Sequence, residues 1–190
     1  MSRIKSLPPE IRQWVGRLRN RYMGVPWNIL AKTGKDFYCG HDAFFRKNES
    51  IRIGDNVYMG KNVHIAAPCV IRSDVMLASY VALVGGDHQY KTPSVPMNQS
   101  GRDVMEPITI EEDVWIGHGA IILSGVCIAQ GSIVAAGSIV TKNVPPCEIW
   151  GGTPVKFIRS RFETESEKRS HIAYLSDLYD GSLGQESIQD

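Results

Sequence analysis

An aliphatic side chain recurs at every sixth position in two long stretches of this chain. Ile, Val, Leu and Met make up 50 of the 190 residues, so about one position in four would match by chance. The repeat places these side chains at Ile53, Met59, Ile65, Ile71, Leu77 and Leu83, and again at Ile110, Ile116, Ile122, Ile128, Val134 and Val140. Because no position of the pattern fails, we expect one short structural unit to be used repeatedly.

A second position of each unit, four residues after the aliphatic one, is small or branched. Two inward positions in six residues fit neither a 3.6-residue helical stripe nor the alternation of a simple strand. They fit a parallel β-helix, in which three units close one triangular coil and neighbouring coils pair at about 4.8 Å. No unit buries its apolar face alone, so we expect an all-β fold whose core comes from stacked coils. The second set is Val57, Val63, Cys69, Val75, Val81, Val114, Ala120, Val126, Ser132, Ser138 and Val144.

Four segments of the repeat carry a resemblance to a known family. They are residues 53–57 (IGDNV), 110–120 (IEEDVWIGHGA), 137–145 (GSIVTKNVP) and 151–159 (GGTPVKFIR). Over roughly residues 40–160 the chain resembles the hexapeptide-repeat acyltransferases, and it is most similar to sugar O-acetyltransferases of the galactoside, maltose and colanic-acid type. The resemblance implies a left-handed β-helix, acetyl-CoA as donor, a sugar or glycan acceptor, and a homotrimer with active sites between subunits.

The rest of the chain divides around the repeat. We expect an N-terminal helix and an irregular opening coil over residues 1–50, and the β-helix over 51–160 with an excursion loop at 84–109. Residues 161–190 read as a C-terminal helix with a polar tail, because Ile172, Leu175 and Leu178 follow helical spacing there.

Composition limits the classes of function. A formal net charge of +1 argues against a dedicated nucleic-acid surface. The first residues hold no apolar signal core, and no run is long enough for a membrane span, so a cytoplasmic protein is expected. The cysteines form no CxxC pair and read as small core residues of a reduced protein: Cys39, Cys69, Cys127 and Cys147.

A short amphipathic helix is predicted from about Pro9 to Met23. Its apolar positions are Ile11, Trp14, Val15, Leu18 and Tyr22. Its other positions include Arg12, Arg17, Arg19 and Arg21. We favour a helix that packs over the first coil and solvates its arginines, with weak contact to an anionic membrane surface as the alternative.

The excursion loop holds the best candidate for a general base. His88 lies at the root of the loop, where the resemblance places the catalytic histidine, and an imidazole can accept a proton near neutral pH. The alternative is a loop histidine that makes an ordinary hydrogen bond. Either Asp87 or a backbone carbonyl could orient its ring.

The resemblance also implies the donor site. Trp115 would wall the acetyl pocket, and the amide after Gly117, that of His118, would bind the thioester carbonyl. Core or interface packing is the alternative for Trp115. The remaining positions carried over for coenzyme A are Ala135 and Ala136 beside the pantetheine arm, then Thr141, Lys142, Lys156 and Arg159 near adenine and phosphates.

The acceptor site departs from the family pattern. Galactoside and maltose enzymes bring an Asn and an Asp to the sugar from the coil before the base, whereas residues 64–69 here read HIAAPC. A different sugar is therefore expected, with His64, Asp87, Tyr90 and Lys91 as candidate contacts.

Other functions remain on the same fold. A γ-class carbonic anhydrase needs two histidines five positions apart, and no pair among the five histidines has that spacing, so no metal is expected. Acetylation of an amine on a nucleotide sugar or of a xenobiotic stays open. A non-catalytic scaffold is less consistent with His88, Trp115 and the basic C-terminal positions.

Overall fold

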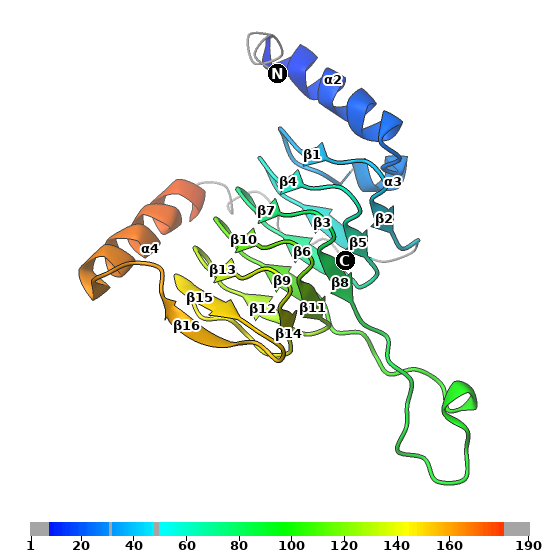
Figure 1. Cartoon of the computed structure of the whole chain (residues 1–190). Helices are drawn as coiled ribbons and strands as arrows, with labels where there is room; N and C mark the ends of the chain where they lie inside the picture. The colour runs from blue at the N-terminus through cyan, green and yellow to red at the C-terminus, as the bar shows by residue number, and fades with distance from the viewer. Residues whose placement is uncertain (1–7, 31, 48–49, 181–190) are drawn as a thin grey trace.

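The computed structural model describes residues 8–30, 32–47 and 50–180, and the chain coils into a three-sided prism (Figure 1). It is a left-handed parallel β-helix with flanking helices, which confirms the fold expected from the repeat and the resemblance. The predicted tail beyond residue 180 lies outside the described residues. The helical elements are α2 (Pro9–Tyr22), α3 (Trp27–Leu30), the 3₁₀ turn η1 (Met97–Gln99) and α4 (Glu165–Asp180).

Each side of the prism is one sheet, and the chain visits the three faces in turn. The first face holds β1 (Tyr38–Cys39), β4 (Tyr58–Met59), β7 (Met76–Leu77), β10 (Trp115–Ile116), β13 (Ile133–Val134), β15 (Glu148–Gly151) and β16 (Lys156–Ser160). The second face holds β2 (Phe44–Phe45), β5 (His64–Ile65), β8 (Ala82–Val84), β11 (Ile121–Leu123) and β14 (Ile139–Val140). The third face holds β3 (Ile51–Ile53), β6 (Cys69–Ile71), β9 (Ile108–Ile110) and β12 (Cys127–Ile128).

Left-handed backbone conformations recur at two of the three edges of the prism, and Gly125 (φ +79°) adopts one at the remaining edge. We call the passage from the first to the second face the first edge, from the second to the third the second edge, and from the third to the first the third edge. Asn and Asp tolerate positive φ better than most residues, and Gly adopts it freely. The positive-φ residues are Asp42, Asn62, Tyr80, Gly119 and Gly137 at the first edge, and Asp36, Asn56, Asp74, Asp113, Gly131 and Cys147 at the third.

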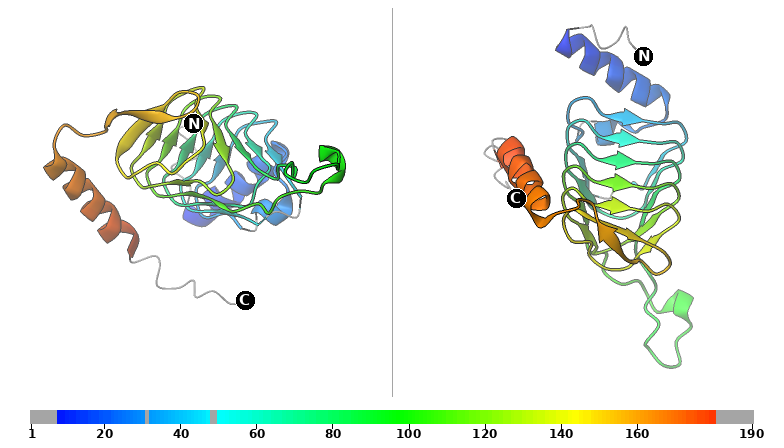
Figure 2. Two further views of the ribbon diagram at one scale, coloured as in Figure 1. Left: turned by 90° about the horizontal axis from the view of Figure 1, so that it is seen from below. Right: turned by 60° about the vertical axis from the view of Figure 1, so that its left-hand side comes forward.

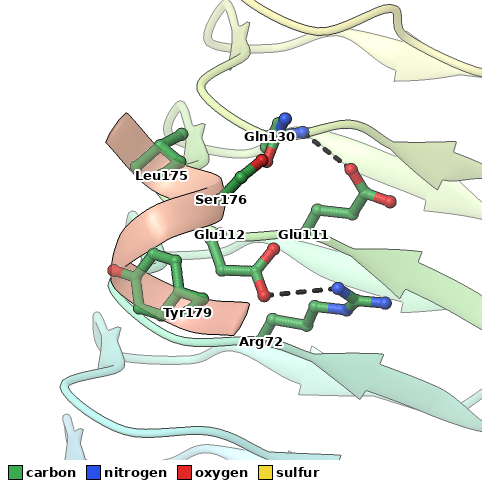
Figure 3. Close-up of a pocket in the computed structure, with 7 residues that line it drawn as sticks. All are labelled: Arg72, Glu111, Glu112, Gln130, Leu175, Ser176 and Tyr179. Atoms are coloured by element: carbon green, nitrogen blue, oxygen red, sulfur yellow. Dashed lines mark hydrogen bonds and ion pairs between the residues drawn. The ribbon is translucent and has the colours of Figure 1, made fainter. Parts of the chain in front are cut away.

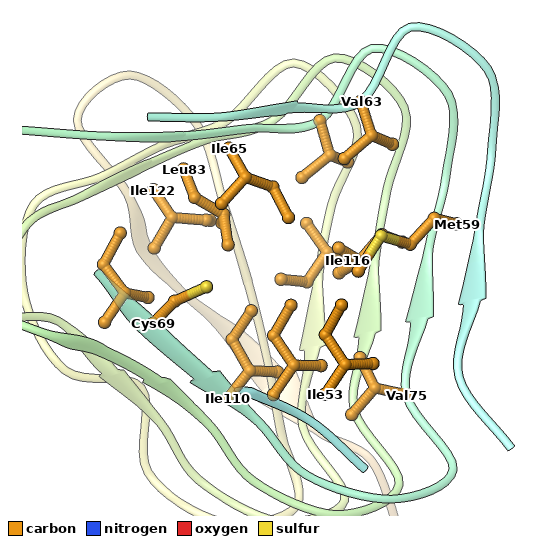
Figure 4. Close-up of a cluster of buried hydrophobic side chains, with 14 of the residues drawn as sticks. Ile53, Met59, Val63, Ile65, Cys69, Val75, Leu83, Ile110, Ile116 and Ile122 are labelled. Atoms are coloured by element: carbon orange, nitrogen blue, oxygen red, sulfur yellow. The ribbon is translucent and has the colours of Figure 1, made fainter. Parts of the chain in front are cut away.

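The repeat positions form the core (Figure 4). All twelve aliphatic positions are at most 4% exposed, and the second set of inward positions is at most 3% exposed. Two of these inward positions are serines with satisfied hydroxyls: Ser132 donates to the Pro145 carbonyl at 2.6 Å and Ser138 to the Ala135 carbonyl at 2.7 Å. A polar side chain is therefore accommodated without an unmet hydrogen bond.

The connection between β8 and β9 leaves the prism as an arm, defined here as residues 85–107. Its two strands meet at the root through a bridge between His88 and Arg102, and the Gln89 amide donates to the Gly101 carbonyl at 3.1 Å. Further out the arm stands clear of the prism, on the side away from α2 (Figure 1). Residues 89–99 are all exposed.

Helix α2 lies across the N-terminal end of the prism (Figure 2). The helix was expected to pack over the first coil with its arginines in solvent; the structure places it there (Figure 2), and its large apolar side chains stay exposed. The buried contact is Asn20, whose amide nitrogen donates to the Phe37 carbonyl at 2.9 Å and whose oxygen accepts from the Cys39 amide at 3.2 Å. A side chain that satisfies two backbone groups of an end coil outcompetes apolar residues that find no partner surface there.

Helix α4 packs along the third edge. Asp113 accepts from Arg161 at 2.5 Å and contacts His171 Nε2 at 2.8 Å, and Tyr179 donates to Asp74. Leu175 is buried against the prism at 3% exposure. None of the helices within residues 8–30, 32–47 and 50–180 is long and apolar enough to cross a bilayer.

Candidate functional site

His88 lies at the second edge, where the arm leaves the prism. Its backbone is fixed by the bridge to Arg102, and the Asp103 amide donates to the Asp87 carbonyl at 2.9 Å. The Arg102 side chain ties the root further by donating to the Gly86 carbonyl at 2.6 Å. The imidazole is thus held on a short ribbon rather than on a free loop.

The arm departs through two glycines that the geometry requires. A Cβ on Gly85 would lie 2.6 Å from the Ser124 Cβ, which no side chain can tolerate. Gly86 has φ +83°, a conformation that disfavours other residues, and Met105 lies directly beside it. Arg46 from the second face reaches the same place, with its Nη1 3.9 Å from the Met105 sulfur.

The ring of His88 has a buried nitrogen without a partner. Its Nδ1 makes no hydrogen bond to any residue that the structure describes. Neither Asp87, which is exposed, nor a backbone carbonyl of those residues therefore orients the ring through Nδ1. An unpaired buried polar atom is costly, and this nitrogen is the part of the ring that the described residues leave unsatisfied.

Trp115 lies on the outer side of the first face. It is 48% exposed and stands in register between Met76 on one side and Ile133 on the other. The structure thus rules out simple core packing for Trp115. Its ring is available to a ligand or to another protein surface.

Gly117 and His118 turn the chain at the first edge. A Cβ on Gly117 would lie 2.5 Å from the Ala136 amide nitrogen, so only glycine allows the two coils to approach here. The Gly117 amide donates to the Val134 carbonyl at 2.8 Å, and the His118 carbonyl accepts from Gly137 at 2.8 Å. Within the described chain the His118 amide donates to no backbone or side-chain acceptor. It is a free donor in the turn that follows β10, three residues after Trp115.

The other predicted donor-site residues lie along the next coil and the last strands. Ala135 and Ala136 stand at the first edge directly after β13, where small side chains leave room against the coil. Thr141 and Lys142 follow β14, and the Lys142 Nζ lies 5.0 Å from the ring centroid of Trp150. Lys156 and Arg159 are both exposed on β16, the strand at the end of the first face.

The structure therefore gathers the predicted residues into two groups. The donor group, defined here as Trp115, Gly117, His118, Ala135, Ala136, Lys156 and Arg159, occupies the first edge and the first face. Thr141 and Lys142 follow β14 and lie at the second edge. His88 and the arm residues Asp87, Tyr90 and Lys91 stand at or beyond the second edge, and the second face separates them from the donor group. His64 lies on that second face, with its ring stacked on Phe44 at 4.5 Å between centroids.

Sequence reasoning missed Tyr80, which neighbours the donor group. Its ring centroid lies 5.3 Å from that of His118, across one coil at the first edge. The corresponding corners carry Asn, Asp or Gly, whereas Tyr80 adopts φ +64° with a bulky side chain. A large residue at a corner of the repeat was the available signal.

A pocket of about 230 Å³ between α4 and the third face contains none of the predicted residues (Figure 3). Arg72 and Glu112 face each other inside it at 3.3 Å, and Glu111 accepts from the Gln130 amide at 3.0 Å. The charges in this pocket are thus already engaged in joining coils, which favours a structural role. Leu175, Ser176 and Tyr179 of α4 complete its wall.

Comparisons with known proteins assign the family. The model for bacterial transferase hexapeptide (six repeats) matches residues 107–142. A predicted acetyltransferase of Dictyostelium discoideum is 36% identical over 158 residues, which cover 79% of this chain and 81% of the relative. Galactoside O-acetyltransferase of Escherichia coli is 32% identical over 69% of this chain and 64% of that enzyme. The chain belongs to the hexapeptide-repeat transferase family.

Two further relatives and two solved structures support the same family assignment. The 2,3,4,5-tetrahydropyridine-2,6-dicarboxylate N-acetyltransferase of Staphylococcus saprophyticus is 39% identical over 64% of this chain. The chain spans 40% of that enzyme and 63% of a Saccharomyces cerevisiae relative. A hexapeptide-repeat acetyltransferase of Vibrio cholerae superposes with a TM-score of 0.64 at 28% identity, covering 85% of this chain and 89% of that one. Galactoside acetyltransferase in complex with coenzyme A gives 0.61 at 26% identity, covering 83% and 93%.

Proposed function

We propose that this protein is an acetyl-CoA-dependent O-acetyltransferase that acetylates a sugar hydroxyl in the biosynthesis of a surface polysaccharide or lipopolysaccharide, in the cytoplasm. The observation that carries the proposal is the first edge. There the backbone amide of His118, which donates to no described acceptor, follows the half-exposed Trp115 by three residues, with two alanines on the next coil. A free amide is a suitable donor for an oxygen that gains negative charge.

The residues present suit coenzyme A. Ala135 and Ala136 leave the flank of the coil open, and Gly117 lets the coils approach closely. Lys142, Lys156 and Arg159 supply cations for phosphates, and all three are exposed. When bound, acetyl-CoA supplies an activated thioester.

His88 provides the proton chemistry in this proposal. Its imidazole takes the proton of the acceptor hydroxyl as the oxygen attacks the thioester carbonyl carbon. The His118 amide stabilises the charge that develops on the carbonyl oxygen. The carbon–sulfur bond then breaks, and the imidazolium returns its proton to the departing sulfur, which leaves as the thiol.

A second copy of the chain completes the site. Within one copy the second face separates His88 from the donor group. We therefore propose a homotrimer in which the arm of one subunit brings His88, with Asp87, Tyr90 and Lys91, to the first edge of its neighbour. The exposure of the arm supports this arrangement.

Acetylation of an amine is the alternative within the same chemistry. The relative from Staphylococcus saprophyticus is an N-acetyltransferase, and an amine acceptor also needs a base. An amino group on a nucleotide sugar and a xenobiotic amine are the two acceptor classes to compare with sugar hydroxyls.

Mass spectrometry with labelled acetyl-CoA tests the function across these three acceptor classes. We expect acetyl esters on saccharides and negligible release of coenzyme A without an acceptor, because no covalent enzyme intermediate is needed. His88→Ala should lower turnover by roughly two to four orders of magnitude, the usual contribution of a general base.

His118→Ala is the matched control, since it keeps the backbone amide and loses only the ring contact with Tyr80, so it should lose far less activity than His88→Ala. If stable amides are the only products, the acceptor group is an amine and not a hydroxyl. Full activity in His88→Ala would remove His88 as base. A protein that neither binds coenzyme A nor forms product would be a scaffold.

A further inference from the structure

One side of α2 exposes four large apolar side chains that touch no other part of the described chain closely enough to be buried. Their exposed fractions are high: Ile11 48%, Trp14 62%, Leu18 42% and Tyr22 88%. On an ideal helix, at 100° per residue, these positions fall within an arc of about 80°. They form a continuous stripe, here called the α2 stripe.

The opposite side of α2 already has its partner. Asn20 is 1% exposed and holds the Phe37 and Cys39 backbone groups, as described above. The Arg19 guanidinium lies 3.9 Å from the ring centroid of Tyr38, which also fixes the helix to the first coil. The helix is therefore anchored by the side opposite the α2 stripe, whose side chains remain exposed.

Arginine positions border the α2 stripe on both sides. At 100° per residue, positions 17 and 21 fall beside one border and positions 12 and 19 beside the other. Arg17 and Arg21 are exposed. Residues 1–23 hold six arginines and lysines against one glutamate, a formal charge of +5, which leaves −4 on the remaining 167 residues. The positive charge of the sequence is thus concentrated in its first 23 residues, which include α2.

We propose that α2 docks this protein on an anionic lipid surface. The helix lies in the plane of the interface, with the α2 stripe among the upper acyl chains and the exposed Arg17 and Arg21 against headgroup phosphates. Trp14 and Tyr22 suit this level, because amphipathic rings favour the boundary between acyl chains and headgroups. The charge distribution favours the same orientation, since an anionic surface attracts the helix and repels the acidic remainder.

This docking does not depend on acetyl transfer. The arm extends away from the end that α2 covers, and the donor group lies on later coils. None of the residues assigned to catalysis or donor binding belongs to α2. A failure of the docking proposal is therefore distinguishable from a failure of the proposed function.

Vesicle flotation of the full chain tests the proposal, with phosphatidylcholine vesicles compared with vesicles containing roughly one phosphatidylglycerol in three. We expect binding to the anionic vesicles only, and release at about 0.5 M salt, where screening is strong. Trp14→Ser with Leu18→Ser should lower the partition coefficient at least tenfold. Arg17→Gln with Arg21→Gln should lower it by roughly 30-fold, at about 1 kcal/mol per arginine.

Helix α4 provides a matched control. Tyr174 and Leu178 have the same spacing and similar exposure, 59% and 50%, so Tyr174→Ser with Leu178→Ser removes comparable apolar surface elsewhere. Arg52→Gln with Arg169→Gln removes the same charge outside α2. Both control proteins should float like the wild type, and all variants should keep the wild-type thermal midpoint and activity on a water-soluble acceptor.

Three outcomes would overturn the proposal. The first is no flotation of the wild type with anionic vesicles. The second is equal loss in the α2 and control variants, which would make the effect general. The third is a change in oligomeric mass on replacing Trp14 and Leu18, measured by analytical ultracentrifugation, which would make the α2 stripe a contact between copies of this chain.

Discussion

Tyr80 occupies a corner of the prism where the left-handed backbone conformation favours Asn, Asp or Gly. Left-handed φ costs most L-residues about 1–2 kcal/mol, and Asn or Gly much less. The first edge otherwise uses Asp42, Asn62, Gly119 and Gly137. The Tyr80 side chain makes two contacts in return. Its ring centroid lies 5.3 Å from that of His118, and the Lys61 Nζ lies 5.9 Å from the Tyr80 centroid. Strain retained beside the proposed donor site suggests a functional reason for the tyrosine.

Replacing Tyr80 by Asn separates the two effects. We expect the free energy of unfolding to rise by about 0.5–1 kcal/mol, because relief of strain exceeds the lost ring contacts. We expect kcat/KM to fall, because the ring no longer supports the turn at His118. Urea unfolding and steady-state kinetics measure both quantities. The reciprocal Asn62→Tyr, one coil away, should lower stability and spare activity. If the Tyr80→Asn protein is less stable than the wild type but fully active, the Tyr80 ring serves only in packing.

Buried thiols give the protein an alkaline limit. Burial raises the pKa of Cys69 from 9.0 to about 12, and burial likewise raises the pKa of Cys39 to about 12. Between those values the unfolded thiol loses its proton while the folded thiol keeps it, so stability falls as pH rises from about 9 towards 12. Each thiol contributes a slope of about 1.4 kcal/mol per pH unit in that window.

Cys69→Ala should remove the contribution of one thiol to the pH dependence of the free energy of unfolding. The variant loses some stability at pH 7.5 because the side chain is smaller, but its unfolding free energy should fall less steeply above pH 9. Urea unfolding in the presence of a reductant, from neutral to alkaline pH, provides the comparison. Parallel curves for the two proteins would contradict the assignment.

At the scale of elements, β16 concentrates the charges proposed for the donor. It is the last strand of the first face and presents Lys156 and Arg159 on its exposed surface. Lys156→Ala with Arg159→Ala should raise the KM for acetyl-CoA by roughly tenfold or more, since two charge-assisted contacts are lost, while kcat changes little. Arg169→Ala, an exposed arginine of α4, is the control. An unchanged KM would remove β16 from the donor site.

The coils could be predicted because one rule governs all of them. Each aliphatic position contributes to the same stacked core, so twelve independent positions agreed on one fold. Helix α2 is not part of this repeat. Its periodicity showed where the apolar side lies, but a side is buried only if another surface meets it, and the coil beneath offered backbone groups that Asn20 satisfies better.

The candidate site was predictable in its donor half and less so around His88. Segment 110–120 places Trp115, Gly117 and His118 on one turn, so local sequence fixed their proximity. The arm has no periodicity, and its direction depends on Gly85, Gly86 and the approach of Met105 from its far end. Contacts between residues so distant in sequence leave no local pattern to read.

At the scale of the whole molecule, His88 and the donor group stand on separate edges of one copy. A site that takes its base from one subunit and its donor group from the next can be rebuilt from two defective chains. We expect His88→Ala and Lys156→Ala/Arg159→Ala, each impaired alone, to regain activity when unfolded together and refolded as a mixture.

The amount of recovery follows from random assembly. About a quarter of the interfaces would pair an intact His88 with an intact donor strand, so about that share of wild-type activity should return at low acetyl-CoA. Mixing without subunit exchange supplies the baseline. No gain above the baseline would place base and donor group on the same subunit.

The number of coils between α2 and Trp115 sets the distance of Trp115 from the end of the prism that α2 covers. Strands β1, β4, β7 and β10 follow one another on the first face, three steps of about 4.8 Å, so the tryptophan stands about 15 Å below the coil that α2 covers. If α2 rests on lipid, the prism becomes a spacer of that length. Acetylation would then favour a hydroxyl raised well above the headgroups on a glycan stem, and would pass over a sugar lying flat at the bilayer surface.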